Sequence, residues 1–180
     1  MTGREDLTLG SPDRKKSRVV RFKTAMGSIY EYLPDGRTQR FKTVENDRKK
    51  PMDQIVFIPP WDVIKDEARK NYPKIFQGIE GEGLYESLLL EYIHDRNKTI
   101  RITDNKGKEL SNNQEIQATE HALIFCLDKS NPENSFYLRV SKEPRVGFLT
   151  FDTSKYKGSD GKTYRDKHIG NKVIDIEYSQ

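Results

Sequence analysis

The chain has few of the residues from which covalent and metal-based frameworks are built. It contains one cysteine, Cys126, which excludes an intrachain disulfide and any zinc site made of several cysteines. Its three histidines, at positions 94, 121 and 168, are too dispersed to predict a metal cluster. No stretch approaches the roughly 18 uncharged apolar residues of a membrane helix, and the N-terminal residues lack the apolar segment of a signal peptide. We therefore expect a cytoplasmic protein with no membrane partner.

Apolar residues are scarce as well. Hydrophobic residues make up 33% of the 180 positions and charged residues another 33%, and the mean hydropathy is −0.89. Aromatic residues nevertheless reach 10%, and several short apolar runs are present, which argues against a disordered chain. The length suits one ordinary domain, or a domain with a tail.

The net charge of +4 is distributed unevenly along the chain. Through Lys50 there are 13 basic and 7 acidic residues, whereas the other 130 residues hold 19 basic and 21 acidic ones. We expect residues 1–20 to form a flexible basic arm and residues 21–180 to form a single α+β domain. Basic arms grip phosphates, although the same cations can simply keep a terminus soluble. The cations of this first block that we expect to bind nucleic acid are Arg14, Lys15, Lys16, Arg18, Arg21 and Lys23.

The segment Leu33–Arg37, with the sequence Leu-Pro-Asp-Gly-Arg, predicts a tight hairpin turn. Proline presets φ at the first central position and glycine takes the left-handed position. If Leu33 faces Arg37, one face of the hairpin holds Ile29, Leu33 and Phe41, which we expect to face the core.

The other face of this hairpin is then the exposed one. It combines aromatic rings with cations, a mixture that stacks on bases and holds phosphates. Tyrosine and threonine are also simply good strand residues, so a structural role is the alternative. The residues expected to contact nucleic acid here are Tyr30, Tyr32, Arg40 and Lys42.

The rest of the pattern predicts two helices set between groups of strands. The helices are expected over residues 60–72 and 84–94, where apolar residues recur at helical spacing. Strands are expected over 53–58, 99–103, 121–127, 136–140, 146–151 and 172–178. The fold class is therefore α+β: a mainly antiparallel, strongly bent sheet or partial barrel, with two helices packed on it.

Residues 152–170 form the least ordinary segment, because a long irregular connection inside a compact domain usually has a function. The turn sequence Gly158–Gly161 predicts a second projecting hairpin, again with tyrosines between cations. The residues expected to bind nucleic acid here are Lys155, Tyr156, Lys157, Lys162, Tyr164 and Arg165.

Two weak catalytic candidates are present. Asp104 and Lys106, with an upstream carboxylate, fit the letters of a metal-dependent nuclease of the restriction type, but Asp-Asn-Lys-Gly is also an ordinary hairpin turn. His168, near Asp166 and Asn171, resembles part of a His/Asn nuclease site, without the adjacent histidine pair. We expect no cofactor, and Mg²⁺ only if one of these nuclease hypotheses holds.

The sequence thus favours a protein that binds DNA or RNA through its basic arm and two hairpins. A metal-dependent nuclease is the first alternative. The second is a protein-interaction module of phage or mobile-element origin, with a protein partner or a second copy of the chain.

Overall fold

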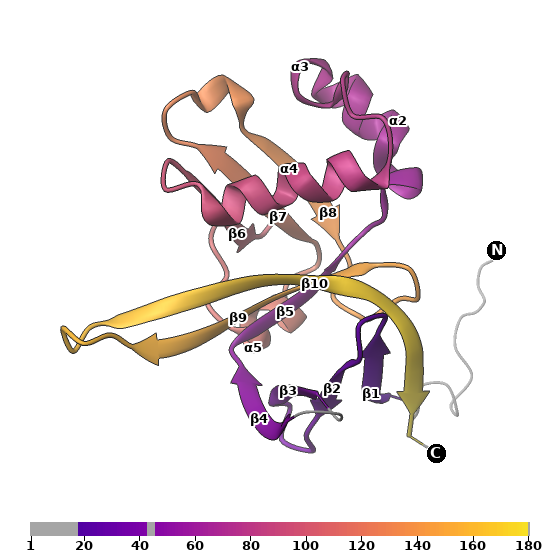
Figure 1. Cartoon of the computed structure of the whole chain (residues 1–180), viewed down its shortest axis with the longest axis vertical. Coiled ribbons are helices and arrows are strands. Elements are labelled where there is room, and N and C mark those ends of the chain that lie inside the picture. The colour runs from indigo at the N-terminus through magenta and orange to yellow at the C-terminus, as the bar shows by residue number, and fades with distance from the viewer. Residues whose placement is uncertain (1–17, 43–45, 180) are drawn as a thin grey trace.

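The computed structural model of the chain describes residues 18–42 and 46–179. Within them the fold is α+β, with a seven-stranded antiparallel sheet, a separate three-stranded sheet and four α-helices (Figure 1). Most of the expected arm lies outside the described residues, including Arg14, Lys15 and Lys16. Residues 19 and 20, which we expected in the arm, belong to the first strand.

The large sheet curls into a half-barrel. Its strand order is β4-β3-β2-β1-β10-β9-β5, so β4 and β5 occupy its two edges although only Asp53 separates them in the chain. The Asp53 backbone N–H donates to the carbonyl of Thr153 at 2.7 Å, which fixes the transition between the two strands. The strands are β1 (Val19–Thr24), β2 (Ser28–Tyr32), β3 (Thr38–Lys42), β4 (Asn46–Met52), β5 (Gln54–Ile58), β9 (Leu149–Lys157) and β10 (Thr163–Tyr178).

The second sheet consists of β6 (Lys98–Thr103), β7 (Ala122–Asp128) and β8 (Phe136–Val140), in that order. One of its faces is covered by helices, and Figure 1 shows α4 crossing in front of it. Along β7, buried and half-buried residues alternate, as expected for a strand with one covered face. The helices are α2 (Trp61–Asn71), α3 (Pro73–Phe76), α4 (Glu82–His94) and α5 (Asn113–Ala118), with a short 3₁₀ helix, η1 (Pro132–Asn134).

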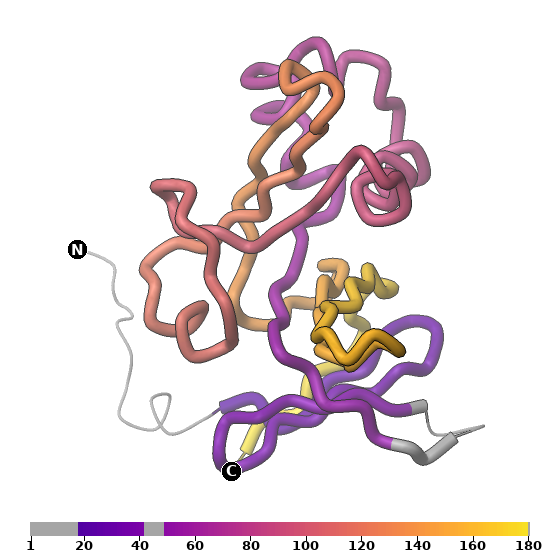
Figure 2. Tube along the Cα trace, turned by 90° about the vertical axis from the view of Figure 1, so that its left-hand side faces the viewer, coloured from indigo at the N-terminus to yellow at the C-terminus, as the bar shows by residue number. Residues whose placement is uncertain are grey.

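Strand β5 separates two hydrophobic cores and contributes residues to both. Val56 and Ile58 pack in the larger core, beneath the helices, whereas Ile55 and Phe57 pack inside the half-barrel. Both faces of β5 are therefore buried, which is why its sequence is a continuous apolar run without alternation. Figure 2 shows this stretch running from the lower strands up to the helical layer.

The expected hairpin at Leu33–Arg37 is confirmed, with Tyr30 opposite Arg40 as predicted. The assignment of its faces is wrong. Tyr30 is 0% exposed, because its ring stacks on Phe22 of β1 at 4.6 Å between centroids and its hydroxyl donates to Asp152 at 2.7 Å. The apolar Ile29 lies on the opposite, partly exposed face.

Strand β10 replaces the irregular connection that we expected over residues 152–170. Its first part pairs with β9 and its last part with β1, so one strand of 16 residues belongs to both sides of the half-barrel. Gly170 lies at the transition, where a Cβ atom would press into the side chain of Thr150 and lie 3.3 Å from the His168 ring. Glycine thus permits the close approach of β10 to β9.

The two expected helices are confirmed as α2 and α4. The short helices α3 and α5 were not expected, nor was the separation of β6–β8 into a sheet of their own. None of the helices among the described residues has the length and apolar character needed to cross a membrane.

We expect Tyr30→Phe to lower the free energy of unfolding by about 2 kcal/mol, because it removes a hydrogen bond to a buried carboxylate and leaves that group less satisfied. Urea denaturation followed by circular dichroism measures this loss. Tyr32→Phe is the matched control, since the described residues offer its hydroxyl no hydrogen-bond partner, and its effect should stay within about 0.5 kcal/mol. Equal effects of the two substitutions would contradict the role of the Tyr30 hydroxyl.

Candidate nucleic-acid interface

The cations expected on the first strands are largely neutralised. Arg21 pairs with Glu31 at 2.8 Å between Nη2 and Oε2, and Lys49 lies 3.3 Å from the same carboxylate. Lys23 stands opposite Asp175 in the register of β1 and β10. The outer face of β1 and β2 therefore combines both signs of charge and does not favour a polyanion.

Arg40 points into a polar cluster instead of toward solvent. Its Nη1 donates to His168 Nδ1 at 2.5 Å and lies 3.4 Å from Asp152 Oδ1, and its side chain is 17% exposed. Asp152 is buried and also accepts from the Tyr30 hydroxyl. The Tyr30 hydroxyl and the Arg40 guanidinium therefore satisfy this buried carboxylate, which is a structural role for two of the expected nucleic-acid contacts. For Lys42 the structure describes the backbone but not the side chain.

Arg18 and Tyr32 line a cavity of about 660 Å³ at the Leu33–Arg37 turn. The cavity wall also includes Arg37, whose Nε donates to Asp35 Oδ2 at 2.7 Å. The charged residues that line it are balanced in number: Arg18, Arg37, Lys142, Asp35, Asp53 and Glu143. With equal numbers of positive and negative groups, this cavity has no preference for phosphate.

The second hairpin has the character that we expected of a nucleic-acid contact. Its tip projects from the body of the molecule (Figure 1). Tyr156 pairs with Tyr164 and Lys155 with Arg165 across its two strands. Because side chains alternate along a strand, the tyrosines share one face and the cations share the other. Tyrosines and cations that alternate along the sequence therefore lie on opposite faces of the hairpin.

The tip of this hairpin is held together by side chains. Tyr156 and Tyr164 stack with 5.8 Å between their centroids, and they remain 53% and 42% exposed. The hydroxyl of Tyr164 donates to Asp160, and this hydrogen bond raises the pKa of Tyr164 and lowers that of Asp160. Among the described residues, Lys157 and Lys162 have no carboxylate at ion-pair distance, so both ammonium groups are available to a ligand.

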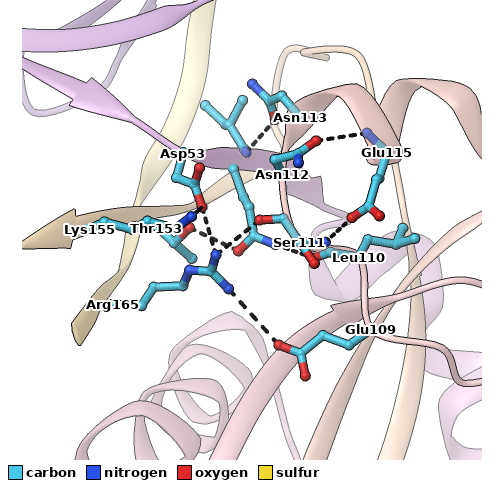
Figure 3. Close-up of polar contacts among 12 residues, drawn as sticks. Asp53, Glu109, Leu110, Ser111, Asn112, Asn113, Glu115, Thr153, Lys155 and Arg165 are labelled. Atoms are coloured by element: carbon cyan, nitrogen blue, oxygen red, sulfur yellow. Dashed lines mark hydrogen bonds and ion pairs between the residues drawn. The ribbon is translucent and has the colours of Figure 1, made fainter. Parts of the chain in front are cut away.

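Arg165 ties the base of the hairpin to the body, as Figure 3 shows. Its Nη2 donates to Asp53 Oδ2 at 2.7 Å and to the carbonyl of Ser111 at 2.9 Å, and its Nη1 lies 3.9 Å from Glu109. Lys155 Nζ is 3.8 Å from the same Asp53 oxygen. The primary role of Arg165 is therefore to fix the direction of the hairpin.

Further cations gather where the hairpin meets β6, and sequence reasoning missed them. Lys167 Nζ donates to Thr99 Oγ1 at 3.0 Å. Burial lowers the pKa of Lys167, and the nearby charges of Arg101, Arg165 and Lys129 lower it further, while Glu109 opposes them. We name Arg101, Lys129, Arg165 and Lys167 the junction cluster. Its members come from β6, from β10 and from the residue that follows β7. Only tertiary structure brings these segments together, so no local signal in the sequence could reveal the cluster.

The residues expected to be catalytic, Asp104, Lys106 and His168, do not come together in one site. Asp104 accepts the backbone N–H groups of Lys106 and Lys108, both at 2.9 Å, and these bonds lower its pKa. The Asp104–Lys106 segment is thus a hairpin turn. No group of three histidine, cysteine or acidic side chains that could hold a metal ion occurs within residues 18–42 and 46–179. His168 contacts Arg40 and Asp152, in the polar cluster described above.

Comparison of the chain with protein-family models, with curated proteins and with solved structures gives no match. No relative therefore bears on what this surface binds.

We expect Lys167→Met to raise the Tm by about 2 to 4 °C at neutral pH, which corresponds to about 1 kcal/mol for a chain of this size. The lowered pKa means that the folded state holds this ammonium less readily than the unfolded chain does. The cost is fully present below the folded-state pKa and disappears as the pH rises past that of an ordinary lysine, about 10.4. Differential scanning fluorimetry between pH 7 and 11 measures the gain and its loss.

Lys70→Met, at an exposed lysine of α2, is the control for this substitution and should leave the Tm unchanged within about 1 °C. A Lys167 variant that is less stable than the parent at pH 7 would show that its bond to Thr99 outweighs the repulsion within the junction cluster.

Proposed function

We propose that the protein binds nucleic acid through the β9–β10 hairpin and the junction cluster. The observation that supports this most is that the basic face of the hairpin leads into the junction cluster. Two carboxylates, Asp53 and Glu109, pair with Arg165 where the two meet, and cations outnumber them. Four cations lie on this face: Lys155, Lys157, Arg165 and Lys167. Lys155 pairs with Arg165 across the two strands, and the other two each lie two residues along the strand from one of these, so all four side chains point to the same side. The basic surface therefore extends from the projecting tip to β6.

The effect of these cations on the stability of the folded state also supports the proposal. Lys167 lies in a partly buried position beside three other cations, and burial and these charges lower its pKa. The Nε atoms of Arg101 and Arg165 are buried and have no hydrogen-bond partner within the described part of the chain. Groups that lower stability are often retained because function needs them, and the phosphates of a nucleic acid would neutralise these cations.

The proposal differs from the sequence-based hypothesis in the surface that it uses. In the first hairpin Arg37 pairs with Asp35 and Arg40 points inward to Asp152, and on β1 Arg21 pairs with Glu31. These three cations therefore add little to a basic groove with the second hairpin. Binding is assigned to the second hairpin and the junction cluster, and Tyr30, Arg21 and Arg40 are assigned structural roles. Among residues 18–42 and 46–179, we find no comparable arrangement that favours the nuclease or the protein-interaction hypothesis.

We expect the triple variant Lys155→Gln, Lys157→Gln and Lys162→Gln to bind nucleic acid at least 10-fold more weakly at about 100 mM salt. If each lysine contacts one phosphate, the slope of log K against log salt should flatten by about 3 on a duplex, because each contact releases about 0.9 counterion. Fluorescence anisotropy with labelled DNA and RNA, from 50 to 200 mM salt, measures both quantities.

A control of equal charge change is Lys65→Gln, Lys70→Gln and Lys74→Gln, on helices α2 and α3 away from the hairpin (Figure 1). It should change the affinity by less than twofold. The proposal fails if the parent protein shows no salt-dependent binding to any probe, or if the two triple variants lose affinity equally.

A further inference from the structure

The end of the β9–β10 hairpin is a free-standing ribbon of two strands. Strand β5 pairs with β9 only from Leu149 to Thr153, so beyond this point β9 and β10 pair with each other alone. The free end of the ribbon comprises residues 156–164, because Lys155 and Arg165 still contact Asp53 of the body. At about 3.3 Å per residue, the two paired residues of each strand extend about 7 Å before the turn is added.

Side-chain contacts order the ribbon before any ligand binds. Tyr164 is packed against Tyr156 and against the backbone of Gly158, where a Cβ atom would lie 2.6 Å from the ring. Asp160 accepts the N–H of Lys162 at 2.9 Å as well as the Tyr164 hydroxyl. At its base, Arg165 is bonded to Asp53. A ribbon ordered in advance loses little conformational entropy when it binds.

The dimensions of the ribbon match one kind of nucleic-acid surface. The major groove of B-form DNA is about 12 Å wide and 8.5 Å deep and admits a two-stranded ribbon. The major groove of A-form RNA is too narrow and deep for side chains to enter. With its turn added, the free end of the ribbon is about as long as the DNA groove is deep.

The aromatic residues do not favour a single strand as the ligand. Binding of single strands relies on rings whose faces are open to successive bases. Here Tyr164 is occupied by Tyr156, Gly158 and Asp160, so it stabilises the turn instead of offering a platform. The cations, in contrast, lie on one side of a projecting element and suit the phosphates that line a duplex groove.

We propose that the β9–β10 ribbon enters the major groove of double-stranded DNA, with its basic face toward the DNA and the junction cluster against the phosphates beside the groove. This inference rests on the proposed nucleic-acid binding and specifies its substrate. Lys155 and Lys157 face the groove from β9, Lys162 reaches a phosphate from the turn, and Lys167 and Arg101 contact the backbone where the ribbon leaves the DNA.

The test compares three probes of one sequence, about 20 nucleotides long: duplex DNA, duplex RNA and single-stranded DNA. At equal salt, the full chain should bind duplex DNA at least 10-fold more tightly than the other two. Methyl green, which occupies the major groove, should displace the protein, and netropsin, which occupies the minor groove of A·T-rich DNA, should not.

The outcomes separate this inference from the function on which it rests. Salt-dependent binding that is equally tight on single strands or duplex RNA, or displacement by netropsin alone, would overturn groove insertion and leave nucleic-acid binding intact. Absence of binding to all three probes would overturn both.

A charge reversal at the tip of the ribbon tests whether the ribbon causes the preference for duplex DNA. Lys157→Glu with Lys162→Glu alters two exposed side chains, and it should reduce the affinity for duplex DNA to that for single strands. The control Lys70→Glu with Lys74→Glu should keep the preference of the parent protein. Retention of the full preference for duplex DNA in the tip variant would show that the ribbon does not enter the groove.

Discussion

The continuity of β10 is the constraint on which the rest of the structure depends. This one strand pairs with β1 at its end, joins the two sides of the half-barrel in its middle and forms half of the projecting ribbon at its start. The ribbon is therefore an extension of the barrel wall and not a loop attached to it. Its direction follows from the sheet, and the bond between Arg165 and Asp53 secures it to the transition between β4 and β5.

The interior of the half-barrel is more polar than an ordinary core. Asp152, 2% exposed, is surrounded by the Tyr30 hydroxyl, Arg40 and His168. A buried carboxylate is tolerated only when hydrogen bonds and an opposite charge replace its hydration. These partners come from β2, β3 and β10, so the cluster joins the two halves of the sheet. This explains why an arginine and a tyrosine that looked like ligand contacts are turned inward.

Local sequence signals predicted much of the fold. The Pro-Asp-Gly turn fixed the register of the first hairpin, and helical spacing located α2 and α4. The face of that hairpin could not be predicted, because Ile29 and Tyr30 are adjacent and both apolar enough to be buried. Tyr30 is the buried residue because its ring stacks on Phe22 of β1 and its hydroxyl bonds to Asp152 of β9. The pattern of residues along β2 contains no information about either partner.

The candidate site was predicted only in part. The tip of the second hairpin, with Lys157, Lys162 and Tyr156, follows from its Gly-Ser-Asp-Gly turn. The junction cluster does not, since Arg101 and Lys167 are distant in the chain and meet only through tertiary structure. The continuity of β10 was also hidden, because its first half lacks the alternation of apolar and polar residues by which a strand is recognised.

The central claim is that the ligand contacts the β9–β10 ribbon and the junction cluster and leaves the first hairpin untouched. Hydrogen–deuterium exchange of the full chain, with and without saturating duplex DNA, tests it most directly. The account predicts slower exchange in peptides that cover residues 154–167 and 98–103, with no change over residues 28–41. Protection confined to β1–β3, or to α2 and α4, would contradict it.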